Sequence, residues 1–175
     1  MRERIRVIDT TLRDGSHSLA HQYSAGDIGR VAAALERAGL DTIEVTHGDG
    51  LGGSSIQYGR ARITDREALR AARAVLCKTM LAVLLLPGIG VKEDLETACA
   101  EGARVVRVAT HVTEADISAQ HMTLAKQTGM EVIGFLMLAH MEPAQKVLEQ
   151  ARLMESYGAD VVYVVDSDGA MLPDD

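Results

Sequence analysis

The five residues Gly102-Ala103-Arg104-Val105-Val106 combine a glycine, a small residue, a charged residue and a short β-branched run. Glycine is common just past the end of a helix, where the backbone needs a positive φ, and such a run is typical of a buried strand. The same form recurs at residues 39–43, 129–133 and 158–162. The chain is therefore expected to consist of repeated units in which a helix is followed by a strand.

The segments between these repeats carry the signals of helices and strands. Before Gly39, apolar residues recur at the spacing of one helical face. Ser24, Thr64 and Thr113 are each followed three residues later by an acidic residue, as in a capping box, and Pro143 suits a first helical position. The pattern predicts strands at 5–10, 42–47, 81–86, 105–110, 131–138 and 161–166, alternating with helices at 24–38, 65–77, 92–101, 115–128 and 143–157.

Strict alternation of strands and helices implies right-handed βαβ units and a parallel sheet. A doubly wound sheet and a (β/α)8 barrel both satisfy this order. The repeat of roughly 30 residues and the polar residues at nearly every strand end favour the barrel. A closed barrel needs eight strands. We therefore expect an α/β fold of the (β/α)8 TIM-barrel type that is incomplete, with about six βα units in a single partial domain over residues 1–175.

The composition limits the classes of partner. Hydrophobic residues make up 47% of the 175 residues and charged residues 25%, as in globular proteins. A net charge of −7 and the lack of a basic cluster argue against nucleic acid or an anionic membrane surface as a partner. The longest apolar run, from Met80 to Leu86, is too short to span a membrane. Cys77 and Cys99 have no companion motif and the N-terminus has no signal-peptide pattern, which favours a cytoplasmic protein.

In a barrel, functional side chains lie on the loops that follow the carboxyl ends of the strands. Five of the six histidines occupy such positions; His121 is the exception and is expected to be a solvated residue of a predicted helix. This concentration predicts a single site. The polar residues at or just beyond the strand ends are Asp9, Arg13, Asp14, His17 and His21 for the first strand, Glu44, Thr46, His47 and Asp49 for the second, Thr110 and His111 for the fourth, His140 for the fifth, and Asp166, Ser167 and Asp168 for the sixth.

The densest of these segments is residues 9–17, Asp-Thr-Thr-Leu-Arg-Asp-Gly-Ser-His. A carboxylate can ligate a hard divalent cation, an adjacent arginine can hold a carboxylate or enolate oxygen, and histidine can move a proton near pH 7. The alternative is structural: Arg13 and Asp14 form a salt bridge and the histidines cap neighbouring elements. Residues 48–53 formally match a dinucleotide-binding fingerprint, but no helix is expected to open there, so a flexible loop over the active face is the better interpretation.

The stretch from Asp9 to Gly15 resembles the signature of the pyruvate-handling lyases and synthases related to HMG-CoA lyase and isopropylmalate synthase. Those relatives usually carry Gln where this chain has His17. The form Arg-Asp-Gly-Ser-His, followed by His-Gln-Tyr at 21–23, is instead similar to the 4-hydroxy-2-oxovalerate aldolase family. The resemblance runs through all 175 residues, with further matching segments at 44–55, 86–90, 109–111, 113–116, 134–137 and 165–167.

This resemblance implies a class II aldolase that cleaves 4-hydroxy-2-oxopentanoate into pyruvate and acetaldehyde during the meta-cleavage catabolism of aromatic compounds and steroids. By position, Asp14 would ligate a divalent metal, most often Mn²⁺, and contact the 2-oxo acid substrate. Arg13 would bind the substrate and stabilise its enolate, His17 would be the general base, and Ser167 would bind the substrate. Leu84 and Leu86 share one face of a strand and could line the aldehyde pocket, with core packing as the alternative.

The same family carries two further metal ligands in a His-x-His motif on the seventh strand, a later substrate-contacting Tyr, and a helical domain used by an acylating acetaldehyde dehydrogenase. None of these occurs in the sequence. We therefore expect the C-terminal strands and the helical domain to be absent, and the chain alone to be weakly active or inactive. His47, His111 and His140 occupy positions from which they could replace the missing ligands. Two alternatives remain, a condensing enzyme similar to homocitrate synthase and a non-catalytic binding or assembly module with the aldolase fold.

Overall fold

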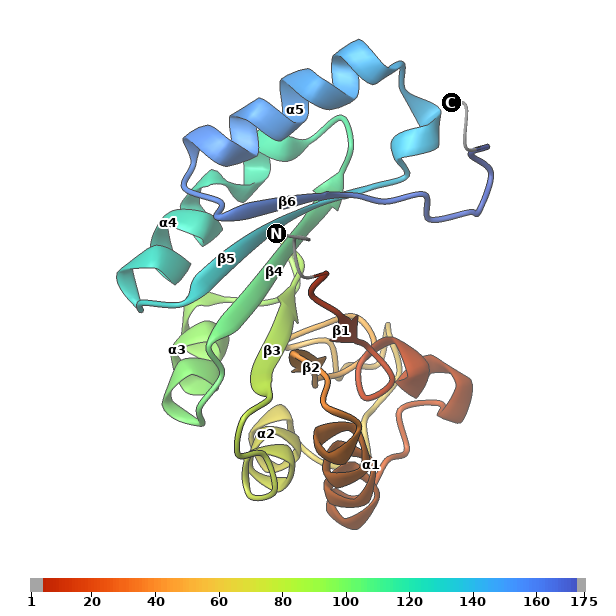
Figure 1. Cartoon of the computed structure of the whole chain (residues 1–175), viewed down its shortest axis with the longest axis vertical. Coiled ribbons are helices and arrows are strands. Elements are labelled where there is room, and N and C mark those ends of the chain that lie inside the picture. The colour runs from red at the N-terminus through yellow and green to blue at the C-terminus, as the bar shows by residue number, and fades with distance from the viewer. Residues whose placement is uncertain (1–4, 173–175) are drawn as a thin grey trace.

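The computed structural model describes residues 5–172 as an open, curved parallel sheet with helices along its outer side (Figure 1). Six strands are found in these residues, and they pair in parallel in chain order, from β1 to β6. The strands are β1 (Ile8–Asp9), β2 (Thr42–Glu44), β3 (Met80–Leu85), β4 (Val105–His111), β5 (Glu131–Met137) and β6 (Val161–Val164). The α-helices are α1 (Ala25–Ala38), α2 (Asp65–Arg73), α3 (Lys92–Ala100), α4 (Ala119–Gln127) and α5 (Ala144–Ser156), with short 3₁₀ helices at Asp14–Leu19, Ala115–Ser118 and Ala139–Met141.

The order of the strands distinguishes the two folds that the alternation allowed. A doubly wound sheet reverses its strand order at a switch point and carries helices on both faces. Here each strand pairs with its neighbour in sequence, and the helices follow the outside of the curve (Figure 1). The predicted TIM-barrel type, incomplete at six strands within the described residues, is confirmed.

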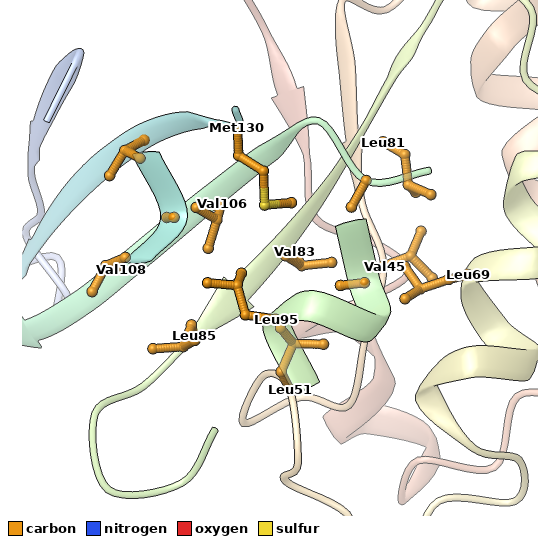
Figure 2. Close-up of a cluster of buried hydrophobic side chains, with 14 of the residues drawn as sticks. Val45, Leu51, Leu69, Leu81, Val83, Leu85, Leu95, Val106, Val108 and Met130 are labelled. Atoms are coloured by element: carbon orange, nitrogen blue, oxygen red, sulfur yellow. The ribbon is translucent and has the colours of Figure 1, made fainter. Parts of the chain in front are cut away.

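Alternate residues of each strand face opposite sides of the sheet, which separates two apolar clusters. On β3, Leu81, Val83 and Leu85 pack with the helices in the large outer core, which Figure 2 shows together with Val106 and Val108 of β4. The smaller inner cluster is formed by Ala82, Val105 and Ile133, with partly buried residues of β1 and β6 against it. The inner face carries charged residues as well: Glu131, at the start of β5 on the same face as Ile133, pairs with Arg6 at 2.7 Å, and Arg107 on β4 lies nearer the carboxyl ends of the strands than Glu131 does.

Gly134 on β5 shows how closely a helix approaches the sheet. A Cβ at this position would lie 2.6 Å from Sδ of Met154 on α5. Met154 is fully buried. The glycine therefore lets α5 pack directly against the strand, and any larger residue would push the helix away.

Several predicted boundaries differ from the observed ones. Helix α2 ends at Arg73 instead of 77, where the side chain of Arg73 donates to the carbonyl of Leu76 and the chain turns toward β3. The capping box predicted at Thr113 is absent, because its hydroxyl lies 2.7 Å from Nδ1 of His111 and the helix start at Ala115 has no side-chain cap. Pro143 is the N-cap residue of α5 and not its first residue.

The two cysteines differ in their exposure to solvent. Cys77, predicted at the end of the helix 65–77, is instead exposed in the bend after α2, and Cys99 is half-buried on α3; both are free thiols. Within residues 5–172 there is no helix with the length and apolar character that crossing a membrane requires.

The carboxylate of Glu36 on α1 connects this helix to the turn before β3, and the strength of this connection depends on pH. The amides of Lys78 and Thr79 donate to its two carboxylate oxygens at 2.9 and 3.0 Å. These hydrogen bonds, with that of the Thr79 hydroxyl, hold the pKa of Glu36 at about 2, below its ordinary 4.5.

Because the folded pKa of Glu36 is lowered, its contribution to stability is complete above pH 4.5 and is lost as the pH falls toward about 2. We expect Glu36→Gln to remove this pH-dependent part, so that the urea midpoint falls less between pH 4.5 and 2 in the variant than in the wild type. Asp14→Asn, which changes an exposed carboxylate, serves as the control. Parallel midpoint curves for wild type and Glu36→Gln would contradict this assignment.

Candidate active site

The loops at the carboxyl ends of the strands surround a cavity of about 770 Å³. The four residues with a role implied by the resemblance all line this cavity: Arg13, Asp14, His17 and Ser167. Arg13, Asp14 and His17 follow β1, whereas Ser167 follows β6, so the cavity brings together residues from the two edges of the sheet. Its other walls come from Thr10, Gly48, Asp49, Leu84, Leu86, Arg107, Phe135, Met137, Val162, Tyr163, Val164, Val165 and Asp166.

A buried ion network lies at the floor of this cavity. The carboxylate of Glu44 on β2 is fully buried and accepts hydrogen bonds from Nε of Arg13 and from Nη1 of Arg107 on β4, the latter at 2.9 and 3.1 Å. A buried charge is tolerated only when it is paired and hydrogen-bonded. Two guanidinium groups satisfy Glu44, and in return Glu44 fixes the guanidinium of Arg13 from behind.

Arg107 is a site residue that the sequence reasoning missed. Its side chain is only 6% exposed, and its guanidinium carbon lies 4.2 Å from the ring centroid of Phe135 and 5.5 Å from that of Tyr163. Among the described residues its Nε has no hydrogen-bond partner. One signal was available: Arg107 interrupts an otherwise apolar strand at an inward position, and such a charge needs a buried partner.

Asp14 presents its carboxylate to solvent beside Arg13. Its side chain is 64% exposed and accepts one hydrogen bond, from Nη1 of Arg13 at 2.8 Å. An accessible carboxylate is a suitable ligand for a hard divalent cation. Within residues 5–172, however, no two further metal-ligating side chains join Asp14 in one group. The described residues therefore supply one carboxylate ligand for the divalent metal that the resemblance implies, and they do not supply a complete set of ligands around it.

His17 is exposed at the mouth of the cavity and is the outer member of a row of three imidazoles. Its ring meets that of His21 edge-on, with the centroids 4.9 Å apart, and His21 stacks on His47 at 3.7 Å. Gly48 makes room for this arrangement, because a Cβ there would lie 2.4 Å from Nε2 of His17. Residue 48 can therefore be only glycine while His17 keeps this position.

The loop from Gly48 to Gly53 is anchored and not flexible, which corrects the expectation from its glycine content. Leu51 is 1% exposed, and its amide donates to the carbonyl of Leu84 at 2.9 Å. Asp65, at the start of α2, accepts the amides of His47 and Gly52 at 3.2 and 3.0 Å. Burial raises the pKa of Asp65 above its ordinary value. As expected, no helix opens in this loop, so it lacks the strand–turn–helix context of the dinucleotide fingerprint.

Other polar residues at the strand ends have local partners. Asp9 accepts the amide and hydroxyl of Thr11, which shapes the turn after β1. His111 is engaged with Thr113, and His140 lies 3.3 Å from Asp166 and 3.4 Å from Asp168. None of these histidines, nor His47, forms a metal-ligating group with Asp14 in the described residues.

Ser167 and the two leucines complete the cavity. The hydroxyl oxygen of Ser167 accepts the amide of Leu138 at 3.0 Å, which leaves its proton free to donate. Leu84 near the end of β3 and Leu86 just after it both line the cavity, and Leu84 is at the same time buried, so both alternatives stated for these leucines hold in part. His121, expected to be solvated, is instead half-buried on α4, with Nδ1 buried and unpartnered among the described residues.

Comparison with known sequences gives matches along the whole chain. The HMGL-like family matches residues 4–175. The chain is 58% identical over 175 residues to 4-hydroxy-2-oxovalerate aldolase of Carboxydothermus hydrogenoformans, covering 100% of this chain and 52% of that protein. It is 61% identical over 169 residues to 4-hydroxy-2-oxovalerate aldolase of Pelotomaculum thermopropionicum, covering 97% and 50%. The chain thus spans about half the length of the curated relatives that it matches.

Solved structures support the fold. The carboxyl transferase domain of Rhizobium etli pyruvate carboxylase, with pyruvate and biocytin, superposes with a TM-score of 0.78 at 21% identity, over 99% of this chain and 32% of that one. A crystal structure of 2,3-dimethylmalate lyase gives a TM-score of 0.61 at 17% identity, over 90% of this chain and 56% of that one. At these identities the likeness concerns the arrangement of strands and helices alone.

Proposed function

The chain belongs to the HMGL-like family, and from this premise we propose that it is the catalytic part of a divalent-metal-dependent aldolase. The proposed reaction splits 4-hydroxy-2-oxopentanoate into pyruvate and acetaldehyde, as a step in the catabolism of aromatic compounds. The observation that carries the proposal is the convergence of Arg13, Asp14, His17 and Ser167 on one cavity in a chain so similar to 4-hydroxy-2-oxovalerate aldolases. Because the chain spans about half of those relatives, the activity is proposed for a protein completed to their length.

The proposed cleavage begins with proton abstraction. His17 takes the proton of the C4 hydroxyl, the C3–C4 bond breaks as the C4 carbonyl forms, and acetaldehyde leaves. The electron pair of the broken bond becomes the enolate of pyruvate, which takes a proton at C3 to give pyruvate. A base for the hydroxyl and a sink for the enolate are the two requirements of this chemistry. His17 supports the first role because it is an accessible imidazole on the cavity wall.

Arg13 is placed to serve the second requirement. Glu44 holds its Nε, and Asp14 and the carbonyl of Gly48 accept from its Nη1 at 2.8 and 3.4 Å. A guanidinium fixed in this way needs no reorganisation when negative charge develops on the enolate oxygen. Donors of this kind are worth roughly 10²–10³-fold in kcat.

Asp14 would provide one carboxylate ligand for the divalent cation, for which we propose Mn²⁺. When bound, such a cation supplies Lewis-acid polarisation of the 2-oxo group. Ser167 is proposed to donate its free hydroxyl proton to the substrate. Leu84 and Leu86 give the cavity an apolar wall suited to the methyl end of the aldehyde.

The setting of the enzyme is also a proposal. The two free thiols and the net charge of −7 are compatible with a cytoplasmic protein that binds a small 2-oxo acid, and neither nucleic acid nor a membrane. An acylating acetaldehyde dehydrogenase is the proposed protein partner of the completed enzyme, because it would consume the reactive aldehyde product.

To test the proposed function, residues 1–175 replace the matching half of the Carboxydothermus hydrogenoformans relative. We expect the chimera to release pyruvate from 4-hydroxy-2-oxopentanoate with Mn²⁺ and to lose this activity with a chelator. The 175-residue chain alone is expected to show little or no turnover. The measurement is pyruvate formation coupled to lactate dehydrogenase, with the unaltered relative as the control.

Two results would contradict the proposal. Condensation of acetyl-CoA with a 2-oxo acid, without cleavage of 4-hydroxy-2-oxopentanoate, would favour a condensing enzyme. A folded chimera that neither binds Mn²⁺ nor releases pyruvate would favour a binding or assembly module with this fold.

A further inference from the structure

A group of metal-ligating side chains lies at the wall of the cavity and consists of His17, His21 and Asp49. Each offers one donor atom, and these atoms lie within 4.8 Å of one another. Across residues 5–172 this is the one group of three such side chains, and it does not include Asp14. Two imidazoles and one carboxylate form the ligand set of several zinc sites in which a fourth position stays open.

The carboxylate of Asp49 has no cationic partner in the described part of the chain. The neighbour within ion-pair distance is His47, whose Nδ1 lies 3.4 Å from Oδ2. That Nδ1 accepts the amide of Asp49 at 3.1 Å, while Nε2 donates to the carbonyl of Gly59, also at 3.1 Å. An imidazole with one accepting and one donating nitrogen is neutral. The half-buried carboxylate is therefore available to a cation.

Ser16 orients His21. The hydroxyl of Ser16 lies 3.0 Å from Nδ1 of His21, which leaves Nε2 of that ring as the ligand atom. Hydrogen bonds of this kind to the second nitrogen commonly orient metal-binding histidines. The ring of His21 also stacks on that of His47, with the centroids 3.7 Å apart, which holds its plane.

Glycines leave room for both rings. A Cβ on Gly59 would lie 3.0 Å from Cδ2 of His21, and Gly48 is in similarly close contact with His17. His17 is also exposed, so solvent reaches the group and its side chain can change rotamer. The imidazole of His21 is thus held in place, whereas that of His17 can move.

We propose that His17, His21 and Asp49 bind a divalent transition-metal cation of the zinc class, with water as the fourth ligand. In a tetrahedral zinc site with ligand distances of about 2.0–2.2 Å, the donor atoms lie roughly 3.4 Å apart. Binding therefore requires the three donor atoms to approach one another, and the exposed side chain of His17 can make this movement. Imidazole suits zinc, whereas the exposed carboxylate of Asp14 suits harder cations such as Mn²⁺. One consequence rests on the proposed function: zinc bound to His17 would occupy the proposed base and inhibit the aldolase.

The test is a titration of the 175-residue chain with ZnCl₂ by isothermal calorimetry, with Co²⁺ as a visible-absorption probe of four-coordinate geometry. We expect one zinc ion per chain. His21→Ala and Asp49→Asn should each lower the zinc affinity at least about 10-fold, since loss of a ligand costs no less than loss of an orienting partner. His111→Ala, which removes an imidazole outside the group, should leave the affinity unchanged.

Absence of zinc binding in the wild type, or an affinity retained in both His21→Ala and Asp49→Asn, overturns the proposal. Loss of binding in Asp14→Asn with retention in His21→Ala also overturns it, because the ion would then belong to the Asp14 site. Circular-dichroism melts without metal establish that each variant is folded, and if one ligand variant fails to fold, the other decides. Pyruvate is not measured, so the aldolase assay and this titration can fail independently.

Discussion

His17→Ala is expected to lower kcat of the chimeric aldolase by about 10²–10⁴-fold, the usual contribution of a positioned general base. His17 is exposed on the cavity wall, and its contacts with the neighbouring imidazole are modest, so the loss should reach the chemistry with little effect on stability. KM for 4-hydroxy-2-oxopentanoate should change much less than kcat, because Arg13 and Ser167 remain to bind the substrate.

The pH profile separates a base from a packing residue. Protonation of the base causes kcat/KM to fall toward acid pH, and this fall should disappear from the residual activity of His17→Ala. His111→Ala is the matched control, since His111 is the last residue of β4 and bonds Thr113 outside the cavity. Full turnover in His17→Ala would show that another group takes the proton.

Local signals in the sequence predicted the repeating units and the identity of the residues that follow the strands. The glycine at the start of each repeat marks a helix end, and Gly39, Gly102, Gly129 and Gly158 all have positive φ. The motif around Arg13 and His17 indicated where the cavity lies because carboxyl ends of parallel strands meet at one edge. These inferences depend on neighbours in sequence, which a single chain displays directly.

What could not be predicted depends on contacts between distant segments. The pairing of Glu44 with Arg107 follows from the registers of β2 with β3 and of β3 with β4, in which Glu44 pairs with Ala82 and Arg107 with Leu84. Likewise, the loop after β2 contains the glycines of a flexible segment, but Leu51 is buried and Asp65 holds it from α2. The spacing of residues within one segment does not reveal contacts between distant segments.

Glu44→Leu is expected to destabilise the chain by about 3–5 kcal/mol, because it leaves the buried guanidinium groups of Arg13 and Arg107 without their shared carboxylate. The measurement is the free energy of unfolding in urea, with the 175-residue chain. Glu155→Leu, at an exposed glutamate on α5, is the control and should lie within about 0.5 kcal/mol of the wild type. A Glu44→Leu variant within about 1 kcal/mol of the wild type would mean that the network relaxes and is not a structural requirement.

The double variant Glu44→Leu/Arg107→Met separates stability from catalysis. Replacing a buried ion pair by apolar residues of similar volume is often neutral or stabilising, so the double variant should recover much of the lost stability. It should not recover kcat in the chimera, because Arg13 still lacks the carboxylate that holds its Nε and would lose its fixed orientation toward the enolate. Recovery of kcat together with stability would show that Asp14 and the carbonyl of Gly48, the other acceptors of Arg13, are sufficient to position it. The buried carboxylate is thus expected to serve two purposes that only the double variant distinguishes: it neutralises the inner face of the sheet, and it aims the arginine that receives the developing charge.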